Sequence, residues 1–294
     1  RFEFMLLAGE TKAEMNNIDT ACRLLAPHGW SADNAVLQRH AVYTFRGCVA
    51  SQWRQGRLML AGDAAHLMPP FAGQGLCAGL RDSAALGWRL DQLLRGNADN
   101  SVLDSYGPER SAHVRRFIDF SIMLGGVVCI LDAEAAAGRD AFLLGPGKQQ
   151  EDRYPGSSLP PSRHLRAGDA QAGELSPQGR VRQGEREGRF DDVAGRGFVL
   201  LGVDGDPAAA LNAAQRQFLD RIGARVLRVV AGAGAGGAND VDSGTLQDSD
   251  GVYRQWLAQL GAPAVLVQPD FYVFGAGTAP ALVDALQASL QTRR

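Results

Sequence analysis

One stretch, residues 56–88, restricts the fold of this chain more than any other: GRLMLAGDAAHLMPPFAGQGLCAGLRDSAALGW. Its apolar start, residues 57–61, predicts a short buried strand, and Asp63 follows directly after that strand. Two consecutive prolines then stiffen a loop and remove two N–H donors. Apolar residues recur at helical spacing over residues 76–95, which predicts a long helix. Strand, tight turn, rigid loop and helix in this order are typical of a ligand site at a strand end in an α/β protein.

The turn and the loop carry groups that suit a flat, partly anionic ligand. The carboxylate of Asp63 can accept hydrogen bonds from sugar-like hydroxyl groups, and Gly73 lets the backbone approach the ligand closely. At the start of the helix, the N–H groups of Gly75, Leu76 and Cys77 have no acceptor within the helix and lie at the positive end of its dipole. These amides therefore predict an anion-binding edge.

Composition excludes several classes of protein. The formal net charge is −2 and aromatic residues make up 7% of the chain, so neither a basic surface nor a stacking platform for nucleic acid is expected. The 4 cysteines form no CxxC pair and lie near no histidine cluster. That pattern argues against a metal site or a thiol redox centre, and it favours a reducing, cytoplasmic compartment. No apolar run is long enough to predict a membrane span.

The first part of the chain, residues 1–150, predicts one α/β unit. Strands are expected over residues 2–7 and 41–49, and Thr11 with Glu14 forms a capping-box pattern that starts a helix reaching about residue 25. A further helix over residues 103–131 is expected to bend near its two consecutive glycines. Because residues 2–7 resemble a strand from the middle of a sheet, we expect further sequence upstream.

A linker and a smaller unit follow. Residues 151–188 are rich in Gly, Pro and Ser, which is typical of a linker. Residues 189–294 alternate strands and helices and predict a thioredoxin-like α/β domain. The strands expected in this part cover residues 198–203, 224–231, 264–267 and 271–274, the helices cover residues 207–222, 252–260 and 279–290, and residues 232–249 are expected to be a loop.

At the turn, the sequence resembles the class A flavoprotein monooxygenases, which are FAD-dependent aromatic hydroxylases. The second flavin motif of that family, G-D-A-A-H-x-x-P-P, matches residues 62–70 without gaps. The opening RFEFMLLAGE is most similar to the branch that contains 3-(3-hydroxyphenyl)propionate hydroxylases. The D-G-V-Y of residues 250–253 and the V-Q-P-D of residues 267–270 resemble the C-terminal domain of the phenol hydroxylase branch, where Gln268 and Phe271 depart from the usual Arg and Gly.

This resemblance implies a site for FAD. Asp63 would contact the ribityl hydroxyls, the helix amides would contact the negatively charged pyrimidine edge of the reduced ring, and Pro70 would lie near the ring face and the substrate. The cofactor-binding residues that we predict are Gly62, Asp63, Pro70, Gly73, Gln74, Gly75, Leu76 and Cys77. For the substrate they are Pro69, Phe71 and Arg46. The resemblance further implies that NAD(P)H reduces FAD, and that a flavin C4a-hydroperoxide hydroxylates a small phenolic ring without a catalytic side chain.

One departure from the family leaves alternatives open. The first flavin motif, G-x-G-x-x-G after a strand, is absent in that context, and the GAGAGG of residues 232–237 is interpreted as a loop. We therefore expect a C-terminal fragment that by itself holds flavin weakly or not at all and is inactive. The alternatives are a non-catalytic protein whose thioredoxin-like tail forms a homodimer, and another flavin chemistry such as epoxidation or halogenation. His66 is expected to be structural, and the neighbours Arg81-Asp82 and Glu109-Arg110 are expected to form structural ion pairs.

Overall fold

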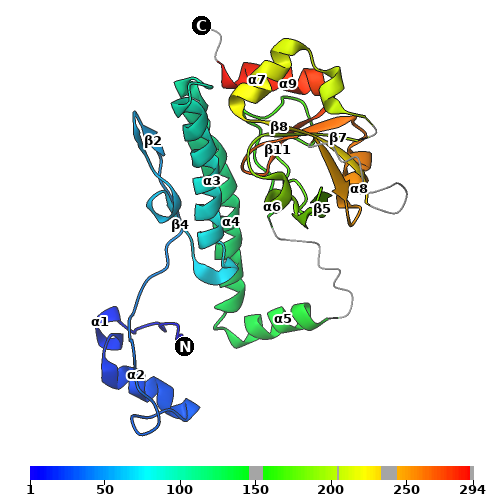
Figure 1. The fold of residues 1–294 in the computed structure, drawn as a ribbon. Helices are drawn as coiled ribbons and strands as arrows, with labels where there is room; N and C mark the ends of the chain where they lie inside the picture. Colours follow the sequence, from blue (N-terminus) through cyan, green and yellow to red (C-terminus); the bar gives the residue numbers. More distant parts are fainter. Residues whose placement is uncertain (146–154, 204, 233–243, 292–294) are drawn as a thin grey trace.

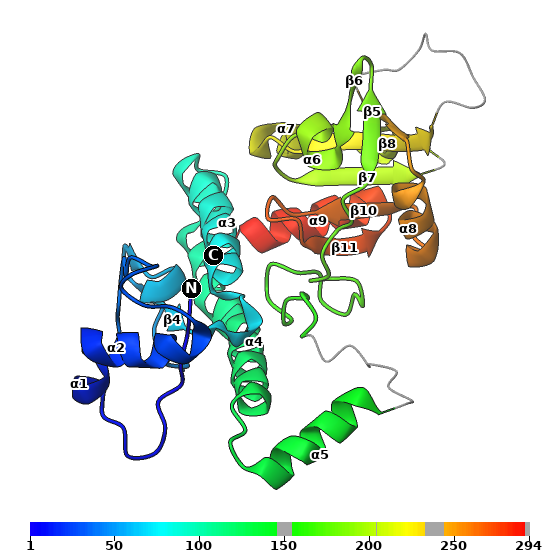
Figure 2. The same cartoon turned by 90° about the horizontal axis from the view of Figure 1, so that it is seen from below.

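The computed structural model describes residues 1–145, 155–203, 205–232 and 244–291. Two long helices, α3 (Gly75–Leu94) and α4 (Tyr106–Val128), lie side by side at its centre (Figure 1). The segment with the G-D turn lies on one side of this pair, and the C-terminal unit with its sheet lies on the other, as the view from below also shows (Figure 2). The helix pair therefore separates the two parts of the chain.

The other elements of the N-terminal unit are short. β1 pairs with β4 and β2 pairs with β3, both antiparallel. Together these elements are α1 (Lys12–Met15), α2 (Ile18–Leu25), η1 (Ala26–His28), β1 (Cys48–Val49), β2 (Arg54–Gln55), β3 (Leu58–Met59), η2 (Gly62–Ala64), β4 (His66–Leu67), η3 (Pro70–Ala72), η4 (Asn100–Leu103) and α5 (Ala133–Leu144).

Several expectations for this unit were wrong. Residues 2–7 form no strand, because no described segment pairs with them, and their apolar side chains are exposed. The strand expected over residues 41–49 is reduced to the two residues of β1, and the one expected over residues 57–61 is reduced to β3. The capping box of Thr11 is confirmed, but Asn17 caps a second helix, so one expected helix is two. α4 runs without a break through its two glycines.

The C-terminal unit is built on a seven-stranded sheet with the order β11-β10-β7-β8-β9-β5-β6, in which β7, β8 and β9 are parallel neighbours and the other pairs are antiparallel. Its strands are β5 (Arg180–Gln183), β6 (Arg186–Arg189), β7 (Val199–Val203), β8 (Arg225–Ala231), β9 (Thr245–Asp248), β10 (Ala264–Val267) and β11 (Val273–Gly277). Its helices are α6 (Phe190–Ala194), η5 (Pro207–Ala210), α7 (Ala213–Ile222), α8 (Val252–Leu260) and α9 (Ala279–Leu290).

The stretch expected to be a linker is largely part of this unit. β5 and most of β6 come from residues 151–188, and Gly173 donates its N–H to the carbonyl of Val273 at 2.8 Å. Composition missed these strands because their charged and glycine-rich sequence has no apolar alternation. β9 lies in the expected loop, and Asn212 caps α7 separately from η5. The glycine-rich run after Gly232 lies outside the described residues.

Each face of the sheet has its own hydrophobic core, and one core includes residues of α3 and η4. On that face Trp88 from α3 and Leu103 from η4 are buried together with Phe198 of the C-terminal unit, and with Leu200 and Leu266 from the sheet. The other face packs α6 and α8 over residues such as Leu246. Burying one large apolar side chain stabilises a fold by about 1.5–3 kcal/mol. The shared core therefore fixes the C-terminal unit against α3.

The turn between β10 and β11 contains the two residues that depart from the family pattern, Gln268 and Phe271. Phe271 has φ of 69°, the left-handed region that favours glycine, and the family pattern has glycine there. Gln268 in the same turn is buried and donates to the carbonyl of His164. Both residues belong to a tight turn, in which the N–H of Phe271 donates to the carbonyl of Gln268. Asp270 of the same turn accepts a hydrogen bond from Trp88 of α3.

Candidate functional site

The G-D turn crosses α3 at a point where both backbones lack side chains. Gly62 has φ of 58°, and a Cβ added to Gly79 of α3 would lie only 3.4 Å from the Cα of Gly62. A methyl group at Gly79 would therefore already be in contact with the backbone of the turn. The two glycines let the turn and the helix approach each other closely.

Asp82 of α3 holds this turn in place. Its carboxylate accepts the N–H of Gly62 at 3.0 Å and the Nε of Arg110 at 2.8 Å, and it lies 2.7 Å from Nε2 of His66. Burial alone would raise the pKa of Asp82, but the partners His66, Arg110 and Gly62 outweigh it and hold the pKa below its usual range. His66 is buried and stacks on Trp53, so its predicted structural role agrees with its contacts.

The first amides of α3 are free to bind a ligand. The earliest N–H that is bonded along the helix is that of Ala78, which donates to the carbonyl of Gln74 at 2.8 Å. Among the described residues, none accepts a hydrogen bond from the amides of Gly75, Leu76 and Cys77. The side chain of Gln74 does not cap the helix either, because its Oε1 accepts from Arg81 at 3.4 Å. The helix therefore begins with three N–H groups and the positive end of its dipole unsatisfied.

The carboxylate and loop residues predicted beside these amides are accessible. Asp63 in η2 is exposed, and within the described part of the chain no side chain or backbone group bonds its carboxylate. Pro70 begins η3 and is exposed, and Gly73 ends η3 with φ of 62°. The turn thus presents a free carboxylate, and the helix N-terminus presents three free amides.

The residues predicted for the substrate are only partly brought together. Pro69 is buried, and its carbonyl accepts from the hydroxyl of Ser121 on α4. Phe71 is 37% exposed and lies against Gly125, where an added Cβ would be 2.5 Å from the ring. Its ring centroid lies 6.0 Å from that of Phe45. Arg46, the next residue, is exposed and makes no hydrogen bond or ion pair with any described residue.

Sequence reasoning missed the role of Asp82 and misassigned two ion pairs. The sequence neighbours do not pair with each other: Arg110 pairs with Asp82, and Glu109 pairs with Arg89 at 2.5 Å, so both pairs cross between α3 and α4. A signal for Asp82 was present, because Gly75, Gly79 and Asp82 are spaced four and three residues apart and share one face of the helix.

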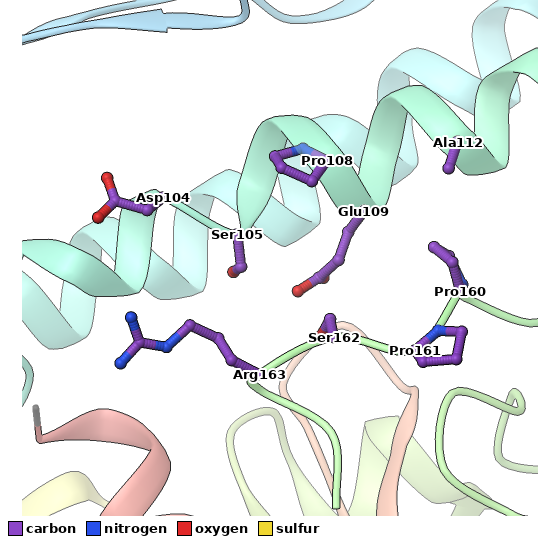
Figure 3. Close-up of a pocket in the computed structure, with 9 residues that line it drawn as sticks. All are labelled: Asp104, Ser105, Pro108, Glu109, Ala112, Pro160, Pro161, Ser162 and Arg163. Atoms are coloured by element: carbon purple, nitrogen blue, oxygen red, sulfur yellow. The ribbon is translucent and has the colours of Figure 1, made fainter. Parts of the chain in front are cut away.

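A separate pocket of about 280 Å³ lies between α4 and the segment at residues 160–163 (Figure 3). The buried carboxylate of Glu109 points into the space between α4 and Ser162. None of the residues of the G-D turn or of the proline loop lines this pocket. Its lining residues are Asp104, Ser105, Pro108, Glu109, Ala112, Pro160, Pro161, Ser162 and Arg163.

Within the described ranges, no individual helix is both long and apolar enough to cross a membrane, although residues Asn100–Val128 and Ala133–Leu144 meet that test together with a bend of 113° between them. The same residues contain no group of three or more His, Cys, Asp or Glu that could hold a metal ion.

Comparison with known families defines the class of protein. Residues 1–121 match the FAD binding domain family, and residues 173–292 match the family described as HcaD C-terminal domain. Together with the sequence relatives below, these matches show that the chain is similar, over nearly all of its length, to FAD-dependent aromatic hydroxylases.

Two relatives illustrate the similarity. A probable NADH-specific resorcinol 4-hydroxylase of Rhodococcus jostii (strain RHA1) is 36% identical over 94% of this chain and 50% of its own length. A 3-(3-hydroxy-phenyl)propionate/3-hydroxycinnamic acid hydroxylase of Klebsiella pneumoniae (strain 342) is 33% identical over 93% of this chain and 52% of its own. The chain therefore spans about half the length of the curated relatives that it matches.

Solved structures show the same fold. The ternary complex of aklavinone-11 hydroxylase with FAD and aklavinone has a TM-score of 0.64 at 24% identity, over 96% of this chain and 52% of that one. CabE, an aromatic hydroxylase from angucycline biosynthesis, has a TM-score of 0.66 at 22% identity, over 93% of this chain and 53% of that one. The expected architecture, an FAD-binding part followed by a C-terminal domain, is confirmed.

Proposed function

We propose that this chain supplies the ring-facing half of the flavin site in an enzyme that hydroxylates a small phenolic ring. The observation that carries the proposal is the row of three free amides at the start of α3, together with the free carboxylate of Asp63 on the turn that packs against the same helix. The amides match the negatively charged edge of a reduced flavin, and the carboxylate matches the ribityl hydroxyls. A bound FAD would supply electron transfer from the nicotinamide and the activation of dioxygen.

In this proposal, the residues of the chain position the flavin-binding turn, shield the ring from water and contact the substrate. Asp82 fixes the turn, the proline loop with Pro70 limits access of water to one side of the ring, and Phe71 with Phe45 offers an aromatic surface to the substrate. No described side chain is assigned an acid or base role. Names of the relatives support resorcinol-like or hydroxyphenylpropionate-like substrates, and one of those names supports NADH as reductant.

We further propose that the C-terminal domain is thioredoxin-like in its architecture. Apart from the inserted η5 and β9, the elements follow in the order β7–α7–β8–α8–β10–β11–α9, and this order with the sheet neighbours β11-β10-β7-β8 supports the assignment. A thiol redox role is not part of the proposal, because the sequence contains no CxxC pair. Residence in the cytoplasm and formation of a homodimer remain proposals from the sequence.

Titration with FAD tests the proposed function. FAD is added to the purified chain, and quenching of flavin fluorescence and the change in visible absorption are recorded up to millimolar FAD. In Asp63→Ala, we expect about tenfold weaker binding, because a charged hydrogen bond contributes about 1.5–3 kcal/mol. Asp119→Ala removes an exposed carboxylate of α4 and serves as the matched control. Absence of saturable binding, or equal affinity of the two variants, would contradict the assignment.

A further inference from the structure

Helix α3 contacts both parts of the molecule. Its N-terminal half carries the free amides and, at Asp82, holds the G-D turn. Its C-terminal half docks on the C-terminal unit, where Trp88 donates its Nε1–H to Asp270 at 2.9 Å and Gln92 donates to the carbonyl of Ile222 at 3.4 Å. Figure 1 shows the C-terminal unit beside the upper part of α3 and the G-D segment on the opposite side. One continuous helix therefore joins the two contacts.

The docking of Trp88 is tight. Its side chain is 6% exposed, its ring meets that of Phe198 edge-on with centroids 5.5 Å apart, and Asp270 is also buried. The guanidinium of Arg89 lies 4.4 Å from the centroid of the Trp88 ring and pairs with Glu109 of α4. A displacement of the C-terminal unit therefore has to move Trp88, because a close-packed interior has no empty space to absorb the movement.

A short helical path connects this contact to the flavin-facing turn. Trp88 and Asp82 are less than two turns apart on α3, which is unbroken between them. Asp82 bonds the backbone of Gly62 directly, so the position of α3 sets the position of the turn. Arg110 ties the same carboxylate to α4. The two crossed ion pairs hold the helix pair together as one body.

We propose that the C-terminal unit positions the G-D turn through α3, with Trp88 and Asp82 as positioning residues. That this positioning matters for flavin binding rests on the proposed function. The mechanical coupling itself is a property of the chain without flavin. The C-terminal unit thereby becomes part of the site although it contributes no residue that faces the ring.

Hydrogen–deuterium exchange on the purified chain tests the coupling. The reporter is the segment at residues 60–67, where the Gly62 amide is protected by Asp82. Phe198→Leu loosens the core on the α3 face of the sheet, and Phe190→Leu makes the same change on the opposite face, where Phe190 packs on Tyr253. We expect Phe198→Leu to speed exchange at the reporter by roughly threefold or more, and Phe190→Leu to leave it within about twofold of the parent.

Two further variants keep the test decisive if Phe198→Leu fails to fold. Trp88→Phe keeps an aromatic ring but loses the donor to Asp270, and a smaller increase at the reporter is expected. Asp82→Asn is the positive control, because it weakens the bond to Gly62 itself. Urea unfolding of every variant shows whether exchange follows local or global stability.

Equal reporter rates in Phe198→Leu and Phe190→Leu, or no change in Trp88→Phe, would overturn the coupling. Failure of the FAD titration alone would leave the coupling intact and would remove only the proposed function.

Discussion

Asp82 is the residue on which the candidate site depends most. It is fully buried, and three partners from three different segments converge on it: Gly62, His66 and Arg110. A buried carboxylate with this many donors stays charged, since each donor favours the ionised form. Its charge in turn neutralises Arg110, which is also buried. Buried residues behind the G-D turn therefore determine whether it keeps its conformation.

Replacing Asp82 with Asn should destabilise the protein by about 3 kcal/mol, because it leaves the guanidinium of Arg110 buried without its counter-charge. Urea denaturation followed by circular dichroism measures the change. The control is Asp91→Asn, which breaks the exposed pair with Arg95 on the same helix and should cost at most about 0.5 kcal/mol. Equal losses in the two variants would show that the buried network contributes little.

At the scale of single elements, the long helices α3 and α4 were predictable from the sequence, whereas α5, α6 and several strands were not. α3 starts within one residue of its expected start, because apolar spacing and the preceding glycines are local signals. Residues 2–7 have a strand-like pattern, yet a strand forms only where a partner pairs with it. In the candidate site, the free amides could be predicted from helix geometry alone. The Asp82–Arg110 pair could not, because it depends on the register of α3 against α4.

The two consecutive glycines of α4 offer a matched test of packing against helix propensity. An added Cβ at Gly126 meets no atom within 4 Å, so Gly126→Ala should stabilise the protein by about 0.5–1 kcal/mol. At Gly125 the same methyl would lie 2.5 Å from the ring of Phe71. Gly125→Ala should therefore lose that gain and displace Phe71 from α4.

Thermal unfolding of both glycine variants measures the difference in stability, and FAD titration shows whether the displaced loop alters the site. If Gly125→Ala were as stable as Gly126→Ala, the contact between Phe71 and α4 would be dispensable.

For the whole molecule, two buried histidines predict sensitivity to mild acid. Burial, assisted by nearby Arg110, lowers the pKa of His113 to about 3, and burial, assisted by Arg89, lowers that of His164 to about 4. In the unfolded chain both titrate near pH 6.5. Below that pH the unfolded state binds more protons than the folded state, so the free energy of unfolding falls as the pH decreases from about 6.5 toward 4.

We expect the loss to reach about 2.7 kcal/mol per pH unit when both histidines contribute. Urea midpoints measured between pH 7.5 and 5.0 give the slope. His164→Phe should reduce the slope by about half, and it should also raise stability at neutral pH, because both ring nitrogens of His164 are buried without a partner among the described residues. An unchanged slope would assign the acid sensitivity to other groups.

The core that spans α3 and the sheet also determines how this protein can be divided. A breakpoint placed in the Gly- and Pro-rich stretch before residue 188 would separate Trp88 and Leu103 from Phe198, and would give each product half of one hydrophobic interior. Chimeras that exchange this C-terminal unit with that of a relative therefore have to carry the facing surface of α3 with it. The natural module, in physical terms, is a sheet together with a helix that precedes it by about a hundred residues in the sequence.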